Sequence, residues 1–162
     1  MHTPTGFTPH AIAPPSLSDR TLAFAFAGTK LLIGGNAEEP VVPTLTELER
    51  ADITGVRHYL GRLEGCDCMA IVLSDDAVAP TGFTLIGLRA LFPRMPDAAL
   101  SLAQRAFQVV EWDRTHRFCG RCGTPTRDKE GERAKQCPAC GYVAYPRVTS
   151  TIIAGDTRGY AT

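Results

Sequence analysis

Four cysteines carry the clearest chemistry in this chain, because they form two Cys-x-x-Cys pairs, Cys119 with Cys122 and Cys137 with Cys140. Two residues between the thiols of a pair let both sulfurs reach one ion at about 2.3 Å. A glycine follows each pair and relieves the tight, often left-handed backbone that such a turn needs. The 14 residues between the pairs fall just under the roughly 15 to 20 that are usual for this kind of site. The spacing predicts a tetrahedral zinc site in a ribbon of two short hairpins.

The same four cysteines could instead form two disulfides or be unrelated buried thiols. A disulfide framework belongs to small secreted chains. Residues 1–18 have no basic start followed by an apolar run and a small-residue cleavage site, so we expect a cytoplasmic protein with reduced thiols. No stretch approaches the roughly 18 apolar residues of a membrane span, and we therefore expect no contact with a membrane.

Two further cysteines, Cys66 and Cys68, lie far upstream of the pairs with one residue between them. Their spacing does not match a zinc knuckle, and no other metal-ligating pair stands close to them in the sequence. We interpret them as free thiols near a turn, and the alternative is a second metal or redox site.

The elements that must position the zinc site precede it. With 162 residues and 44% hydrophobic composition, the chain can hold one moderate core and the ribbon. Gly28 is expected in the turn of a first hairpin, and residues 64–67 in the turn of a second. Apolar runs between turn residues predict strands over 22–26, 31–33, 56–63, 69–73 and 83–86.

Helical patterns complete the prediction of an α+β fold. A short helix over 43–50 has Thr44 as a possible N-cap with Glu47 three residues on, and residues 88–92 turn helical again. A long helix starts with Asp97 as its expected N-cap and runs into Trp112, so that it delivers the chain to the first knuckle. We expect a strand-rich N-terminal domain whose long helix leads into a small four-cysteine zinc ribbon. The expected divisions are an irregular arm over 1–18, an α+β domain over 19–113 and the zinc ribbon over 114–147.

Charge is unevenly spread along the chain although the formal net charge is zero. Residues 1–112 carry 8 Lys/Arg and 12 Asp/Glu, while residues 113–162 carry 9 and 5. Four thiolates on Zn²⁺ would bring a further charge of about −2 to the basic part. The remaining excess suits contact with a polyanion and equally suits ordinary solvated surface.

The residues that flank the two pairs form a more specific pattern than the cysteines alone. His116-Arg-Phe precedes the first pair, Tyr145-Pro-Arg follows the second, and Trp112 and Arg105-Ala106 lie upstream. With its cysteines, the run over 105–148 resembles the middle of the NADH pyrophosphatases of the Nudix hydrolase superfamily, which also remove NAD caps from RNA. The preceding segment, including residues 87–91, resembles the N-terminal domain of that family more loosely.

This resemblance implies a domain order, a substrate and a set of partners. In that family an N-terminal α+β domain and a zinc ribbon precede the Nudix catalytic domain. Its enzymes are typically homodimers that hydrolyse NADH or NAD to mononucleotides with Mg²⁺ or Mn²⁺, and NAD-capped RNA is a further substrate. The resemblance matches Cys119, Cys122, Cys137 and Cys140 to the ligands of the structural zinc.

Among the other residues of the ribbon, Tyr145 matches an aromatic that stacks on a base of the dinucleotide. The competing interpretation is a tyrosine that packs the ribbon onto its neighbour. His116 is interpreted as a residue of the helix end, because four thiolates already complete a zinc site. The basic residues of this region, which could meet phosphate or form a solvated face, are Arg117, Arg121, Lys135 and Arg147.

The catalytic signature of the family has no match in this sequence. That signature places several carboxylates on a loop and helix, where they hold a hard divalent cation against a pyrophosphate. The only adjacent pair of glutamates, Glu38-Glu39, is followed by Pro40. We therefore expect residues 148–162 to be the start of a missing Nudix domain or a tail, and the chain to be inactive on its own. The alternative function is a non-catalytic, zinc-stabilised module for dimerisation or nucleotide binding.

Overall fold

The computed structural model describes residues 4–36, 38–92 and 94–146 of this chain. Three helices lie in this part: α1 (Leu45–Arg50), α2 (Leu88–Leu91) and α3 (Asp97–Thr115). The strands of a larger sheet are β1 (Phe7–Pro9), β2 (Leu22–Ala27), β3 (Lys30–Gly35), β4 (Pro40–Val41), β5 (Val56–Leu63), β6 (Cys66–Val72) and β7 (Phe83–Gly87). The strands of a smaller sheet are β8 (Arg127–Asp128), β9 (Lys135–Gln136) and β10 (Val143–Ala144).

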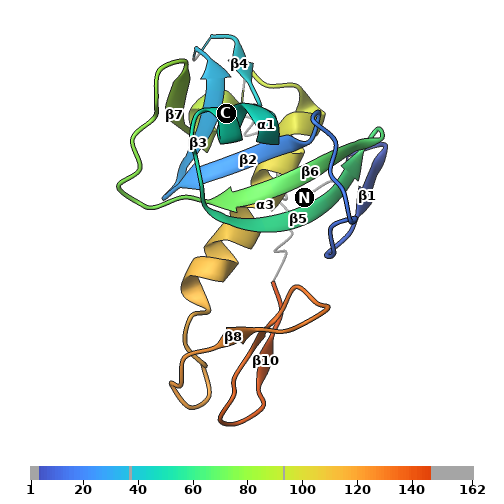
Figure 1. Ribbon diagram of the computed structural model, residues 1–162. Coiled ribbons are helices and arrows are strands. Elements are labelled where there is room, and N and C mark those ends of the chain that lie inside the picture. The colour runs from blue at the N-terminus through green and yellow to red at the C-terminus, as the bar shows by residue number, and fades with distance from the viewer. Residues whose placement is uncertain (1–3, 37, 93, 147–162) are drawn as a thin grey trace, which may run out of the picture.

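The two sheets occupy different regions and are joined through α3 (Figure 1). The larger sheet has the order β1-β5-β6-β2-β3-β4, with β7 paired to β3. Its described strand pairs are antiparallel except for β2 with β6, which run parallel from Leu22↔Cys68 to Phe26↔Val72. The smaller sheet follows α3 and has the order β10-β9-β8. The predicted α+β fold with a helix leading into a cysteine-rich ribbon is confirmed.

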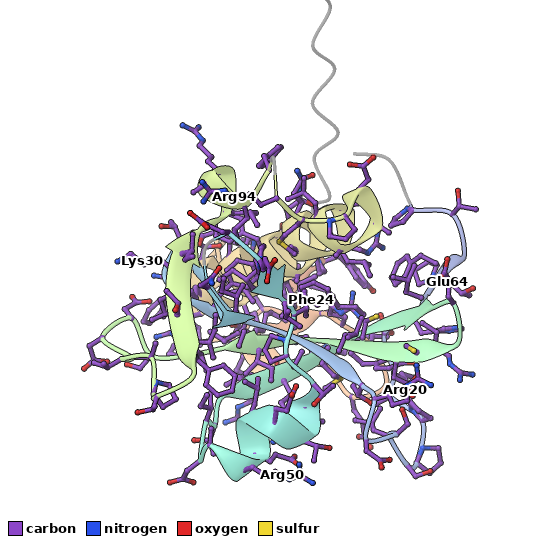
Figure 2. The ribbon with its side chains drawn as sticks, turned by 90° about the horizontal axis from the view of Figure 1, so that it is seen from above. Arg20, Phe24, Lys30, Arg50, Glu64 and Arg94 are labelled. Carbon is purple, nitrogen blue, oxygen red and sulfur yellow. The ribbon has the colours of Figure 1, made fainter. Side chains whose placement is uncertain are left out.

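Strand β2 divides the core by alternating phenylalanine with alanine. Phe24 and Phe26 are fully buried on the face that α3 covers, where they share a cluster with Ala106 of that helix. Ala23 lies in the cluster on the opposite face together with Leu48 of α1. Each fully buried phenylalanine contributes about 1.5 to 3 kcal/mol of transfer free energy. Figure 2 shows Phe24 near the centre of the molecule. The large side chains of β2 therefore anchor α3, the helix that carries the ribbon.

The short helix α1 starts as its sequence predicts, whereas the start of α3 differs by one residue. The Thr44 amide donates to Glu47 Oε2 at 2.7 Å, and the Glu47 amide donates to Thr44 Oγ1 at 3.2 Å, which completes a capping box. Pro96, not Asp97, is the N-cap of α3. The prediction was wrong because Pro96 already has the extended backbone of a cap, which leaves Asp97 in the first turn, where its charge still faces the positive end of the helix.

The N-terminal arm is not irregular throughout, in contrast to our expectation for residues 1–18. Phe7–Pro9 forms β1 on the edge of the sheet, and the pair Phe7↔Leu63 buries the phenylalanine ring. Pro9 is tolerated because it ends an edge strand, where its missing donor is not needed. The partner strand contributes Gly61 at φ +130°, where a Cβ atom would lie 2.1 Å from the Thr8 carbonyl oxygen. Close backbone approach therefore makes this pairing possible.

The second predicted hairpin has a tighter turn than expected. Glu64 and Gly65 form the turn with φ of 49° and 86°, so β6 begins at Cys66. Both Cys66 and Cys68 thus lie in a strand and are free thiols. Burial raises the pKa of Cys68 to about 11. Within the described residues they belong to no group of three or more potential metal ligands, which gives no support to a second metal site.

The remaining predicted elements of the domain are confirmed with small changes in their bounds. Gly28 occupies the turn between β2 and β3 with φ +55°, and β7 and α2 follow each other as expected. In the described part of the chain, no helix has both the length and the apolar character required to traverse a bilayer.

Candidate metal centre and its junction

Two tight turns bring the four cysteines together beyond the end of α3. In each turn the amide of the following glycine donates to the carbonyl of the first cysteine, from Gly123 to Cys119 at 2.8 Å and from Gly141 to Cys137 at 3.0 Å. Both glycines have positive φ, +74° and +71°, which favours glycine over other residues. The sequence signal for two knuckles therefore corresponds to two closed turns whose thiols face the same point.

The distances between the four sulfurs fit one tetrahedral ion. The Cys119–Cys140 and Cys122–Cys140 sulfur pairs are 3.6 Å apart, and the Cys122–Cys137 pair is 3.4 Å apart. All four ligand atoms lie within 4.8 Å of one another. Zinc with four bonds of about 2.3 Å requires sulfur separations of about 3.8 Å. The donor set is therefore that of a closed, four-cysteine metal site rather than of a catalytic site with an open position.

The thiols of this cluster differ in their pKa values. Hydrogen bonds with the side chain and backbone of Thr124 lower the pKa of Cys122 to about 6, with help from the neighbouring thiols. The Tyr142 amide acts in the same direction on Cys140, but desolvation and hydrogen bonds with the other thiols outweigh it and raise the pKa of Cys140 to about 12. A metal ion that recruits all four thiolates therefore releases protons.

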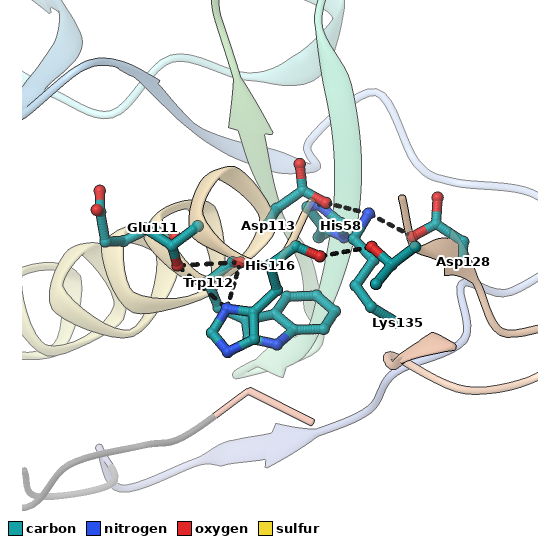
Figure 3. A network of polar contacts seen from close by, with 9 residues as sticks. His58, Glu111, Trp112, Asp113, His116, Asp128 and Lys135 are labelled. Atoms are coloured by element: carbon teal, nitrogen blue, oxygen red, sulfur yellow. Dashed lines mark hydrogen bonds and ion pairs between the residues drawn. The ribbon is translucent and has the colours of Figure 1, made fainter. Parts of the chain in front are cut away.

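A polar network joins the metal ribbon to the N-terminal domain, and Asp113 is its centre (Figure 3). This residue lies in the last turns of α3 and is 7% exposed. Its Oδ1 is 2.7 Å from Lys135 Nζ of β9 and 3.4 Å from His58 Nε2 of β5. Lys135 also reaches Asp128 Oδ1 at 2.6 Å and lies 5.8 Å from the centre of the Trp112 ring. Helix, sheet and ribbon therefore meet on one carboxylate.

The pKa values of this network show how strongly its charges are held. Burial opposes ionisation of Asp113, but hydrogen bonding and charge from His58 and Lys135 prevail and lower its pKa to about 2. Burial also opposes protonation of Lys135, yet its contacts with Asp113 and Asp128 raise its pKa above the ordinary value. The prediction that Lys135 meets phosphate or belongs to a solvated face is therefore wrong, because both nearby carboxylates already bind its ammonium group.

Other hydrogen bonds reinforce the same junction. Thr126 Oγ1 in the ribbon donates to the His116 carbonyl at 2.5 Å. His116 caps the C-terminal end of α3, where its Nδ1 is 3.0 Å from the Trp112 carbonyl oxygen. His116 lies outside the four-thiol group, which confirms its interpretation as a residue of the helix end. Arg133 Nη2 donates to the His10 carbonyl at 2.7 Å and to the Tyr59 carbonyl, so the ribbon also contacts the N-terminal segment and β5.

The remaining predicted site residues lie on the surface of the ribbon. Tyr145 follows β10, is 53% exposed, and donates from its hydroxyl to Glu132 Oε2 at 2.6 Å. That hydrogen bond raises the pKa of Tyr145. Arg117 and Arg121 are exposed, whereas Arg147 and the segment over 148–162, expected to be the start of a Nudix domain or a tail, lie outside the described residues.

Sequence reasoning missed Asp113, His58 and Arg133 as members of the junction. One signal was available, because an acidic residue in the last turn of a helix faces the negative end of the helix dipole and needs a compensating partner. Asp113 stands there in the sequence, just before the first knuckle. The identity of its partners was not readable, since they come from β5 and β9, far away in the sequence.

Two family profiles match consecutive parts of the chain. Residues 20–112 match the NADH pyrophosphatase-like rudimentary NUDIX domain, which covers more than half of the chain, and residues 114–145 match the NADH pyrophosphatase zinc ribbon domain. The chain belongs to the NADH pyrophosphatase family. Strands β2 to β7 with α1, α2 and most of α3 thus form the rudimentary Nudix domain of this family, and the four-cysteine cluster belongs to its zinc ribbon.

Curated relatives agree with this membership in the NADH pyrophosphatase family. The chain is 47% identical over 100 residues to the NAD-capped RNA hydrolase NudC of Deinococcus radiodurans, across 62% of this chain and 35% of the relative. It is 38% identical over 100 residues to NudC of Stutzerimonas stutzeri, in a match that covers 62% of this chain and 36% of the relative. It is 36% identical over 107 residues to NudC of Chromobacterium violaceum, in a match that covers 66% of this chain and 40% of the relative. The matched region thus spans between about a third and two fifths of the length of these relatives.

Proposed function

We propose that these residues form the N-terminal and zinc-ribbon portion of an NAD(H) pyrophosphatase, which hydrolyses NADH or NAD, and the NAD cap of RNA, to mononucleotides. The observation that carries the proposal is the match of both parts of the chain, in order, to the rudimentary Nudix domain and the zinc ribbon of this family. The proposed hydrolytic step needs Mg²⁺ or Mn²⁺ on carboxylates of a Nudix catalytic domain.

Within this portion, Cys119, Cys122, Cys137 and Cys140 are proposed to hold a structural zinc. Their mutual distances and closed donor set support that assignment. The zinc would fix the two knuckles relative to each other, and it would take no part in the hydrolysis. The four thiols leave no position for a substrate oxygen or a water molecule, which is the requirement for a catalytic zinc.

Tyr145 is proposed to contact the dinucleotide in the complete, homodimeric enzyme. Support comes from its position directly after β10 in the ribbon, with an exposed ring whose hydroxyl donates to Glu132. An exposed aromatic ring of this kind stacks on a base with about 1 to 3 kcal/mol.

A chimera tests the proposal directly. Residues 4–146 would replace the corresponding N-terminal domain and zinc ribbon of the Deinococcus radiodurans relative, which keeps its own remaining sequence. We expect this chimera to hydrolyse NADH and to remove the NAD cap from RNA. In it, Tyr145→Ala should raise the KM for NADH about tenfold, whereas Tyr145→Phe should behave nearly as the parent, since the ring is retained.

The same experiment separates the alternative of a non-catalytic module. A chimera that folds, binds one zinc per chain and yet hydrolyses nothing would contradict the proposed role. Tyr142→Ala is the matched control, because Tyr142 is also an exposed ribbon tyrosine, 41% exposed, on the other side of β10 in the sequence. Equal effects of the two alanine substitutions would contradict a specific role for Tyr145. Light scattering of the chain and of the chimera would test the proposed dimer.

A further inference from the structure

A surface cavity of about 500 Å³ lies where the N-terminal segment, α3 and the zinc ribbon meet. Its walls include Arg105 of α3, Arg133 and Tyr145 of the ribbon, and His10 of the N-terminal segment. Because its two guanidinium groups come from different parts of the molecule, the cavity exists only when the ribbon is docked on the N-terminal domain.

Arg105 lines this cavity, and one donor of its side chain has no acceptor among the described residues. Its guanidinium lies 5.5 Å from the centre of the Phe7 ring, which explains where the side chain packs. Its Nε atom is buried, however, and no described residue accepts a hydrogen bond from it. None of the ion pairs among the described residues involves Arg105. The guanidinium that lines the cavity therefore has no carboxylate partner among the described residues.

Arg133 adds a second positive charge without a carboxylate of its own. It donates to the carbonyls of His10 and Tyr59, which orient the side chain but leave its charge uncompensated. Burial lowers the pKa of Arg133, and the charge of Arg105 lowers it further, so the two groups repel each other. The pKa of Arg105 is likewise lowered by burial.

The acidic residue on the cavity wall does not supply the missing partner. Glu132 lines the cavity, but its carboxylate already accepts from Lys129 Nζ and from the Tyr145 hydroxyl. These contacts lower the pKa of Glu132, as expected for a carboxylate with satisfied oxygens. The two arginines therefore face the cavity with an excess of positive charge.

We propose that this cavity binds a phosphate group, held by Arg105 and Arg133. Phosphate offers several acceptor oxygens and a negative charge, and the planar guanidinium fork matches it in two hydrogen bonds. The exposed ring of Tyr145 lies on the same wall and would face a base attached to that phosphate, a contact that rests on the role proposed for Tyr145 above. The phosphate can belong to a free nucleotide or to an oligonucleotide. The site is separate from the four-cysteine centre and requires neither a catalytic cation nor hydrolysis.

Nuclear magnetic resonance of the zinc-loaded 162-residue chain tests this site. The Nε–H signal of Arg105, assigned by its absence in Arg105→Gln, is followed during titration with inorganic phosphate at low salt. We expect a saturable shift of that signal in the wild type. We also expect Arg105→Gln to weaken phosphate binding about tenfold or more by calorimetry, because charge-assisted hydrogen bonds are lost. Arg105→Lys, which keeps the charge but loses the fork, should lie in between.

The matched control is Arg127→Gln, since Arg127 is an exposed arginine of β8 that does not line the cavity. It changes the net charge equally and should alter phosphate binding less than twofold. A wild-type Nε–H signal that does not respond to tens of millimolar phosphate would overturn the proposal, even if a variant fails to fold. Equal weakening by Arg105→Gln and Arg127→Gln would also overturn it, because that result indicates bulk charge alone.

Two further titrations identify the source of the phosphate. Adenosine monophosphate and a short single-stranded oligonucleotide are compared with inorganic phosphate, each with the wild type and Arg105→Gln. Tighter binding of the oligonucleotide with a steeper salt dependence assigns the site to a nucleic-acid backbone, and a preference for the mononucleotide assigns it to a nucleotide end. These titrations involve no turnover, so they can fail while the chimera is active, and they can succeed while the chimera is inactive.

Discussion

Replacing Asp113 with asparagine would remove the charge at the centre of the junction and keep the shape of the side chain. Its neighbours lower the pKa of Asp113 from 3.8 to about 2 in spite of burial, which corresponds to about 2 kcal/mol of folding free energy. Because folding lowers the pKa, this stabilisation is complete above the ordinary pKa and is lost as the pH falls toward 2. A measurement at pH 7 therefore contains all of it. We expect Asp113→Asn to lose about 2 kcal/mol there.

Urea denaturation followed by tryptophan fluorescence suits this test. Trp112 is the only tryptophan of the chain, it precedes Asp113, and its ring centre lies 5.8 Å from Lys135 Nζ. Asp128→Asn is the matched control, because Asp128 contacts the same ammonium group at 2.6 Å but its side chain is 72% exposed. We expect the control to lose less than about 1 kcal/mol. A loss in Asp113→Asn no greater than in the control would refute the reasoning that burial makes this contact strong.

Three more outcomes are expected. The purified chain should contain close to one zinc ion per chain by elemental analysis. Cys137→Ser should lose both the metal and the ribbon fold, because structural zinc contributes about 10 to 16 kcal/mol in small finger peptides. The control variant Cys66→Ser should keep both. Gly61→Ala should release β1, because the new Cβ would lie 2.1 Å from the Thr8 carbonyl oxygen. The measurement is faster amide exchange at His10, whose amide donates to the Leu60 carbonyl at 3.1 Å. Gly28→Ala, in open space, should leave that exchange unchanged. NADH should not be hydrolysed by the chain alone with Mg²⁺ or Mn²⁺, and mononucleotide release that a chelator abolishes would contradict this.

The local elements of the fold were predictable because their signals lie within a few residues. The capping box of Thr44 and Glu47, the turn at Gly28 and the helical period from Leu100 to Val110 each involve neighbours in the sequence. The strand β1 was missed because it has only three residues and the segment around it is rich in proline and threonine. This strand pairs with Gly61 and Leu63 of β5, and no pattern within residues 1–18 indicates that pairing.

The candidate site divides in the same way. The four cysteines could be placed at one ion from their spacing, since each knuckle is complete within five residues. The parallel pairing of β2 with β6 and the meeting of His58, Asp113 and Lys135 depend on tertiary packing, and their positions lie up to tens of residues apart. Counting charges along the sequence also gave a wrong prediction for Lys135. Its ammonium group is paired with Asp113 and Asp128 and is therefore not available to a polyanion.

The metal and the junction have separate roles in the ribbon. Among residues 114–146, the buried hydrophobic residues are Cys119, Ala134 and Cys137, and two of these three are thiols of the cluster. A segment with so small an apolar core cannot offset its loss of chain entropy by burial, so the zinc must hold its two knuckles together. Zinc does not determine how the ribbon sits on the N-terminal domain, however. That orientation depends on Asp113 and Arg133, whose contacts join the ribbon to the N-terminal domain. The same orientation places Tyr145 on the wall of the cavity that Arg105 and Arg133 line.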